Sequence, residues 1–138
     1  MNAIDTVLYT GKTRTVGGRE GHTRSDDGQL DVDLSPPGSR RPGTNPEQLF
    51  AAGWSACFEG AMGIAARKLR VALPADAAID AEVDLGKVGE EYQLQARLAI
   101  SLPGIAPEQA QAIVDEAHRT CPYSKLSRGN IDVQIRLV

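Results

Sequence analysis

A helical signal of unusual length, residues 45–71, most constrains how this chain can fold. Asn45 can cap a helix, Pro46 suits the first helical position, and Gln48 stands where a capping box requires it. Basic side chains fill the last turns, where cations interact favourably with the helix dipole. The sequence therefore predicts one helix from Pro46 to about Val71, which is long for a small domain.

Small side chains recur along this helix at a spacing of four residues. Glycine in a helix interior costs up to about 1 kcal/mol relative to alanine, so close packing against another helix must offset it. The pattern therefore predicts that a second helix approaches closely. One lane holds Gly53, Cys57, Ala61 and Ala65, and the adjacent lane holds Ala52, Ala56 and Gly60.

The 138 residues, 41% of them hydrophobic, suit a single domain over 1–138 with one core. A turn at Ser25-Asp26-Asp27-Gly28 precedes an alternating strand, and two further helices open at Pro107 and Pro122. Strands and helices that cluster, rather than alternate strictly, predict an α+β fold. The expected strands are residues 4–16, 30–34, 79–88, 92–102 and 131–137.

Charge and composition exclude several partners. The net charge is −3 and the pI is about 5.3, so no basic field attracts nucleic acid or an anionic membrane. The N-terminus lacks the basic and apolar blocks of a signal peptide. No apolar run is expected to reach the ~20 residues that span a bilayer. The sequence therefore predicts a cytoplasmic protein with neither a nucleic-acid nor a membrane partner.

Cys57 and Cys121 are the only thiols, and they lie 64 positions apart without a CxxC partner. The two histidines show no metal-ligand spacing, so neither a metal nor another cofactor is expected. A pair of thiols in the cytoplasm indicates a transient, functional bridge. Cys121 stands at a predicted helix N-terminus, which favours its thiolate. Cys57 stands mid-helix, where desolvation should raise its pKa, and a small buried hydrophobe is the alternative interpretation.

A reactive Cys57 needs a cation from elsewhere in the fold, and Arg19 in a glycine-rich loop is the candidate. The alternative for Arg19 is an exposed side chain that is simply solvated. The alternative for Glu47 is that an acidic residue in the first helical turn only interacts favourably with the helix dipole. Together they could form a bidentate pair that aims the guanidinium at a sulfur. Glu47 and Cys57 are ten positions apart, or ~15 Å in a straight helix. The helix must therefore break, or a second subunit supplies the carboxylate, which is the preferred hypothesis.

Four blocks of the chain carry a further signal: Gly17-Gly18-Arg19-Glu20-Gly21, residues 45–53, Ser55-Ala56-Cys57-Phe58 and Cys121-Pro122-Tyr123-Ser124. Together they resemble the organic hydroperoxide resistance proteins, of the osmotically inducible protein C superfamily. The resemblance covers nearly the whole chain and implies an α+β fold, as an intertwined homodimer with antiparallel sheets around long central helices. It implies that Cys57 is the peroxidatic cysteine, Cys121 the resolving cysteine, and that Arg19 and Glu47 activate the thiolate.

The resemblance implies a peroxidase that reduces organic hydroperoxides and is re-reduced by a dithiol, typically on a lipoyl-bearing protein. Phe50, Trp54 and Phe58 are the expected substrate-binding side chains, because they supply apolar surface near the helix. Plain core packing is the alternative for these three. Two rival functions stay open at this point, a general thiol–disulfide oxidoreductase and a non-catalytic module that binds small ligands.

Overall fold

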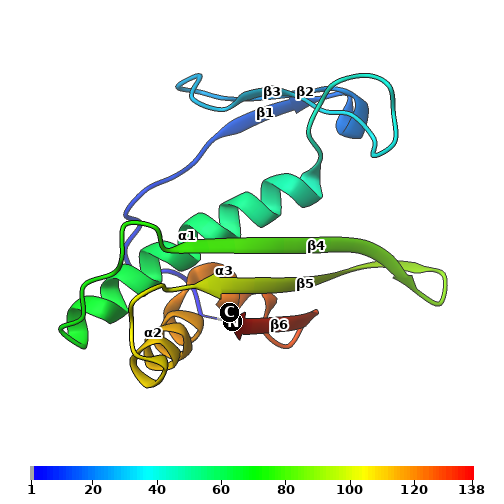
Figure 1. Cartoon of the computed structure of the whole chain (residues 1–138). Helices are drawn as coiled ribbons and strands as arrows, with labels where there is room; N and C mark the ends of the chain where they lie inside the picture. The colour runs from blue at the N-terminus through cyan, green and yellow to red at the C-terminus, as the bar shows by residue number, and fades with distance from the viewer. Residues whose placement is uncertain (1) are drawn as a thin grey trace. The chain divides into compact units, whose positions relative to one another are not determined.

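The structure is a computed structural model that describes residues 2–138 (Figure 1). It divides into two compact units, an N-terminal unit (Met1–Pro46) and a C-terminal unit (Glu47–Val138). Each unit contains a three-stranded sheet, and the three α-helices follow the first sheet along the chain. The predicted α+β class is confirmed, while a single domain over 1–138 stays a prediction.

The N-terminal unit is an antiparallel sheet of order β1-β2-β3. The predicted strand 4–16 is largely wrong, because among residues 2–12 the described chain forms no strand and only the last four residues pair with β2. The turn before β3 is confirmed, since Gly28 adopts φ 73° and its N–H donates to Ser25 O at 3.0 Å. The elements are β1 (Thr13–Val16), the 3-10 helix η1 (Gly18–Glu20), β2 (His22–Ser25) and β3 (Asp31–Asp33).

The C-terminal unit follows the sequence expectation closely along the chain but not in its sheet. Strand β5 pairs antiparallel with β4 and parallel with β6, so the expectation of antiparallel sheets is wrong here. The parallel pair arises because two helices connect β5 to β6 and return the chain to the same end of the sheet. The elements are α1 (Pro46–Lys68), β4 (Ala78–Val88), β5 (Glu91–Ser101), α2 (Pro107–Thr120), α3 (Pro122–Ser127) and β6 (Asp132–Leu137).

Helix α1 begins at Pro46, as predicted, and ends at Lys68, three residues before the predicted Val71. Its end is a Schellman motif, in which the Val71 N–H donates to Ala66 O at 2.9 Å. Arg70 takes the left-handed conformation, with φ 56°, that glycine usually supplies at this position. The 23 residues of α1 are otherwise continuous, so the chain between Glu47 and Cys57 does not break.

One face of the β4-β5-β6 sheet is apolar, and the core of the C-terminal unit forms against it. Alternate residues of β5 point inward, and Ala96, Leu98 and Ile100 are at most 2% exposed. Helix α2 contributes Ile113 and Val114 from one stripe. Helix α1 contributes its own buried stripe to the same cluster, so its orientation is fixed by packing: Trp54, Phe58, Ala61, Met62, Ala65 and Ala66.

Helix α1 also passes a test for membrane-spanning helices by length and composition alone. Its 23 residues include an 18-residue window of mean hydropathy 1.3. Glu59 lies within this helix, so the average does not come from one unbroken apolar run. One such helix is weak support for a membrane span, because core helices of soluble proteins meet the same criteria, and α1 packs its buried stripe into the core described above.

Candidate redox site

The two cysteines, 64 residues apart in sequence, meet in the C-terminal unit. Their Sγ atoms lie 3.5 Å apart. Cys57 projects from the middle of α1 and is half-buried, while Cys121 is fully buried at the junction of α2 and α3. A disulfide requires an Sγ–Sγ distance of about 2.05 Å, so a closing movement of about 1.5 Å would join them. The arrangement therefore allows a bridge without unfolding either helix.

The pKa of the Cys57 thiol is raised, mainly by burial, as the sequence predicts. The neighbouring Cys121 raises it further, because two thiols in contact do not ionise independently. The backbone N–H of Tyr123 lowers it by donating to the sulfur. The sequence analysis expects the N-terminus of α3 to stabilise the Cys121 thiolate. In the structure, an N–H group of the first turn of α3 donates to Cys57 instead.

The first turn of α3 lies on α1 through side chains as well as through the sulfurs. The Tyr123 ring stacks on Phe50, with centroids 5.9 Å apart and an interplanar angle of 17°. The same ring covers Gly53, where an added Cβ would lie 3.3 Å from both Cε2 and Oη of Tyr123. Trp54 Nε1 donates to Ser124 Oγ at 3.3 Å in the buried interior. These contacts hold the first turn of α3 against one stripe of α1, at Phe50, Gly53, Trp54 and Cys57.

Trp54 and Phe58 are core side chains in this structure. Both are 0% exposed and belong to the core cluster, and Trp54 also holds Ser124. Phe50 is only partly buried and packs against Trp54 and Tyr123. The role of these three side chains in substrate binding stays a prediction.

Three contributors to this site were missed by sequence reasoning: Gly53, Tyr123 and Ser124. The block Cys121-Pro122-Tyr123-Ser124 was recognised, but only the cysteine was given a role. The sequence does contain one signal for these contacts. Positions 50, 53, 54 and 57 lie on one face of a helix with 3.6 residues per turn, so residues that contact Cys57 can also contact the other three.

The roles of Arg19 and Glu47 in activating Cys57 stay predictions. Arg19 lies in η1 of the N-terminal unit, and its pairing with Cys57 stays a prediction. Glu47 lies in the first turn of α1, ten residues before Cys57 in a continuous helix. A rise of ~15 Å separates them along the axis, so a helix break no longer explains how Glu47 could serve the thiolate of its own chain.

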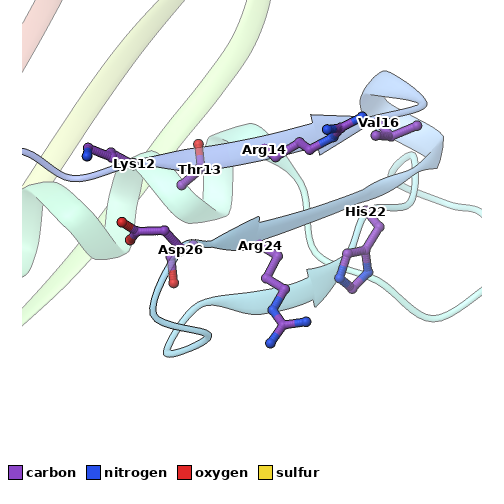
Figure 2. Close-up of a pocket in the computed structure, with 8 residues that line it drawn as sticks. Lys12, Thr13, Arg14, Val16, His22, Arg24 and Asp26 are labelled. Atoms are coloured by element: carbon purple, nitrogen blue, oxygen red, sulfur yellow. The ribbon is translucent and has the colours of Figure 1, made fainter.

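A pocket of about 490 Å³ lies on the sheet of the N-terminal unit and holds neither cysteine (Figure 2). Figure 2 shows side chains from β1 and β2 around it, with the cationic groups of Lys12, Arg14 and Arg24 among them. Its lining includes hydroxyl and amine groups, from Thr13, Ser25 and Lys12, but no thiol. A reaction that depends on a thiol would therefore not take place in this pocket.

Two aspartate carboxylates contact the ring nitrogens of His22. Its Nδ1 lies 2.8 Å from Asp33 Oδ1 and its Nε2 2.5 Å from Asp31 Oδ1, and these carboxylates raise its pKa. With both ring nitrogens used, neither is left for a metal. Across residues 2–138, no group of three or more His, Cys, Asp or Glu side chains is arranged to hold a metal ion.

Comparisons with known proteins agree on one family. The family model described as "OsmC-like protein" matches residues 37–136. The organic hydroperoxide resistance protein of Xanthomonas axonopodis pv. citri (strain 306) is 44% identical over 141 residues, which cover 99% of each chain.

Solved structures extend this similarity to the fold. The crystal structure of the organic hydroperoxide resistance protein OhrB of Bacillus subtilis aligns with a TM-score of 0.89 at 41% identity, covering 96% of this chain and 100% of that chain. A structure of an organic hydroperoxide resistance protein from Legionella pneumophila aligns with a TM-score of 0.88 at 40% identity, covering 96% and 98%. The chain therefore belongs to the OsmC-like family and, within it, to the organic hydroperoxide resistance proteins.

Proposed function

We propose that this protein is a peroxidase that reduces organic hydroperoxides with Cys57 and Cys121. The observation that carries the proposal is the 3.5 Å separation of the only two thiols, in a member of the organic hydroperoxide resistance proteins. Cys57 is the attacking thiol because it is partly accessible and receives the Tyr123 N–H. Cys121 is the resolving thiol because it is fully buried and becomes reactive only toward its neighbour.

The proposed cycle balances in three steps. The Cys57 thiolate attacks the distal peroxide oxygen, the O–O bond breaks, and one proton accompanies release of the alcohol, which leaves a sulfenic acid. The Cys121 thiol then attacks the Cys57 sulfur, forming the disulfide and releasing water. An external dithiol reduces that disulfide through a mixed disulfide and is itself oxidised to a disulfide. Overall, one hydroperoxide and one dithiol give one alcohol, one disulfide and one water.

Because the pKa of Cys57 is raised, its thiolate needs a nearby cation to form at neutral pH. Arg19 is proposed to supply that cation. A guanidinium near a thiolate favours the charged form and can lower a pKa by about 1–3 units. Glu47 is proposed to orient that guanidinium as a bidentate partner. Because α1 is continuous between Glu47 and Cys57, we place the Glu47 carboxylate of one subunit at the Cys57 of another, within a homodimer.

The reductant is proposed to be a small dithiol carried by a lipoyl-bearing protein. The cycle then needs a compartment in which dithiols stay reduced, which is why the cytoplasm is proposed as its location. Cys57 is only half-buried, so its sulfur is the one that an incoming dithiol can reach.

Turnover of cumene hydroperoxide with dihydrolipoamide, glutathione or thioredoxin tests the proposal directly. Wild type should consume the peroxide fastest with dihydrolipoamide, and Cys57→Ser should not consume it with any reductant. A ligand-binding module would leave the peroxide intact, and a general thiol–disulfide oxidoreductase would reduce test disulfides instead. Either result would reject the proposed function.

A further inference from the structure

The turn that carries Cys121 is held against α1 by an aromatic contact with no assigned role. The Tyr123 ring stacks on Phe50 and also lies over Gly53, whose missing side chain makes room for it. The backbone of the same residue donates to Cys57 Sγ. Tyr123 of α3 therefore touches α1 at Phe50, at Gly53 and at Cys57 itself.

From this geometry we infer that Tyr123 is a positioning residue and that Gly53 is required beneath it. The pair fixes how far the turn of α3 stands from α1, and hence the Sγ–Sγ distance of 3.5 Å. The contribution of this pair to the peroxide cycle rests on the proposed function, whereas the positioning of the two sulfurs does not.

Glycine at position 53 is explained by this contact and not by backbone conformation. Gly53 lies inside α1, where alanine would favour the helix, and it has no positive φ. A methyl group there would lie 3.3 Å from two ring atoms of Tyr123, so the ring would have to move by a few tenths of an ångström. Since Cys121 is two residues before Tyr123, the turn that holds its sulfur moves with the ring.

The chain offers a matched control for the helix itself. Gly63 also lies inside α1, and apart from its chain neighbours and the local helix backbone no described atom lies within 4 Å of the methyl that alanine would add there. Gly63→Ala thus changes helix propensity in the same direction as Gly53→Ala without touching Tyr123. Equal elution volumes in size-exclusion chromatography confirm that the variants being compared share one oligomeric state.

Single-turnover kinetics separate positioning from reactivity. Reduced protein is mixed with one equivalent of cumene hydroperoxide, alcohol release reports attack by Cys57, and loss of the remaining free thiols reports closure of the disulfide. In Gly53→Ala, alcohol release should stay within about twofold of wild type, while closure slows about five- to tenfold. Gly63→Ala and Tyr123→Phe should match wild type in both steps, because both keep the ring on Gly53.

A double-variant cycle tests whether the methyl acts through the ring. Tyr123→Ala should slow closure by itself, and Gly53→Ala should add nothing in that background, because the methyl then has no ring to meet. Wild-type closure in Gly53→Ala, or an equal further slowing in the Tyr123→Ala background, overturns the inference. If Gly53→Ala does not fold, Tyr123→Ala compared with Tyr123→Phe gives the same decision.

Closure driven by diamide, a thiol oxidant, separates this inference from the proposed function. The same order of rates with diamide is expected, since the sulfurs must approach each other whatever oxidises them. If wild type releases no alcohol while the diamide rates keep that order, the peroxidase proposal fails and the positioning role stands. If the alcohol is released and all variants close at one rate, the positioning role fails alone.

Discussion

Replacing Trp54 with phenylalanine distinguishes a core residue from the wall of a substrate pocket. The indole is 0% exposed, and its Nε1 donates to Ser124 Oγ at 3.3 Å. Phenylalanine keeps an aromatic ring but removes this donor and part of the buried volume. We therefore expect a loss of stability without a change in how the protein handles peroxides.

The magnitude of the loss has two parts. An unpaired buried hydroxyl costs about 1–3 kcal/mol, and the 3.3 Å bond to Ser124 is long, so about 1 kcal/mol is expected from it. Removing part of a fully buried indole adds about 1–2 kcal/mol, a fraction of the cost of truncation to alanine. For a chain of this size, about 4 °C per kcal/mol converts the sum into a Tm lowered by about 8–12 °C.

Thermal unfolding at one fixed protein concentration measures the shift, because assembly would make Tm depend on concentration. Ser124→Ala is the partner variant, and the double variant should cost less than the two single costs together, since no group is then left unpaired. The KM values for cumene and tert-butyl hydroperoxide should stay within about twofold of wild type. An unchanged Tm with a KM raised only for cumene hydroperoxide would refute the reasoning.

Three further predictions follow from the charges. Arg19→Ala should raise the pKa of Cys57 by about one unit or more and slow its alkylation at neutral pH, and an unchanged pH–rate profile would contradict the proposed cation. Glu47→Ala and Cys57→Ser chains, inactive alone, should recover about half of wild-type activity in a purified mixed dimer, and no recovery would count against a shared site. The two carboxylates beside His22 raise its pKa, so their contribution to stability is complete below pH 6.5 and is lost as pH rises through the higher folded pKa. His22→Gln should remove that part of the pH dependence of the urea midpoint. An identical pH dependence in wild type and variant would mean that the contacts of His22 with Asp31 and Asp33 do not contribute to stability.

The helix that carries Cys57 could be predicted well because its signals are local. Asn45 and Pro46 mark its start, and the observed α1 begins at Pro46. Strands depend instead on partners elsewhere in the chain. Residues 4–16 contain strand-forming types, yet pairing extends only from Thr13 to Val16, where β2 lies alongside. Strand β2 itself was missed because His22-Thr23-Arg24-Ser25 has no apolar alternation.

The site was predictable in its thiols and less so in their surroundings. Spacing along the chain gives no reason for Cys57 and Cys121 to meet, so only the family resemblance brought them together before the structure did. The direction of the Tyr123 N–H depends on how α3 crosses α1, which no local pattern encodes. The burial of Trp54 and Phe58 comes from the structure alone, because helical periodicity shows that two residues share a face but not whether that face lines a pocket or a core.

Mass spectrometry of the protein after one equivalent of cumene hydroperoxide tests the central claim most directly. Free thiols are alkylated, the protein is digested, and the peptides are compared with those of Cys121→Ser. The account predicts a peptide pair linked through Cys57 and Cys121 in wild type, and a dimedone-reactive sulfenic acid at Cys57 in the variant. Two alkylated thiols in wild type, with the peroxide left unconsumed, would contradict it.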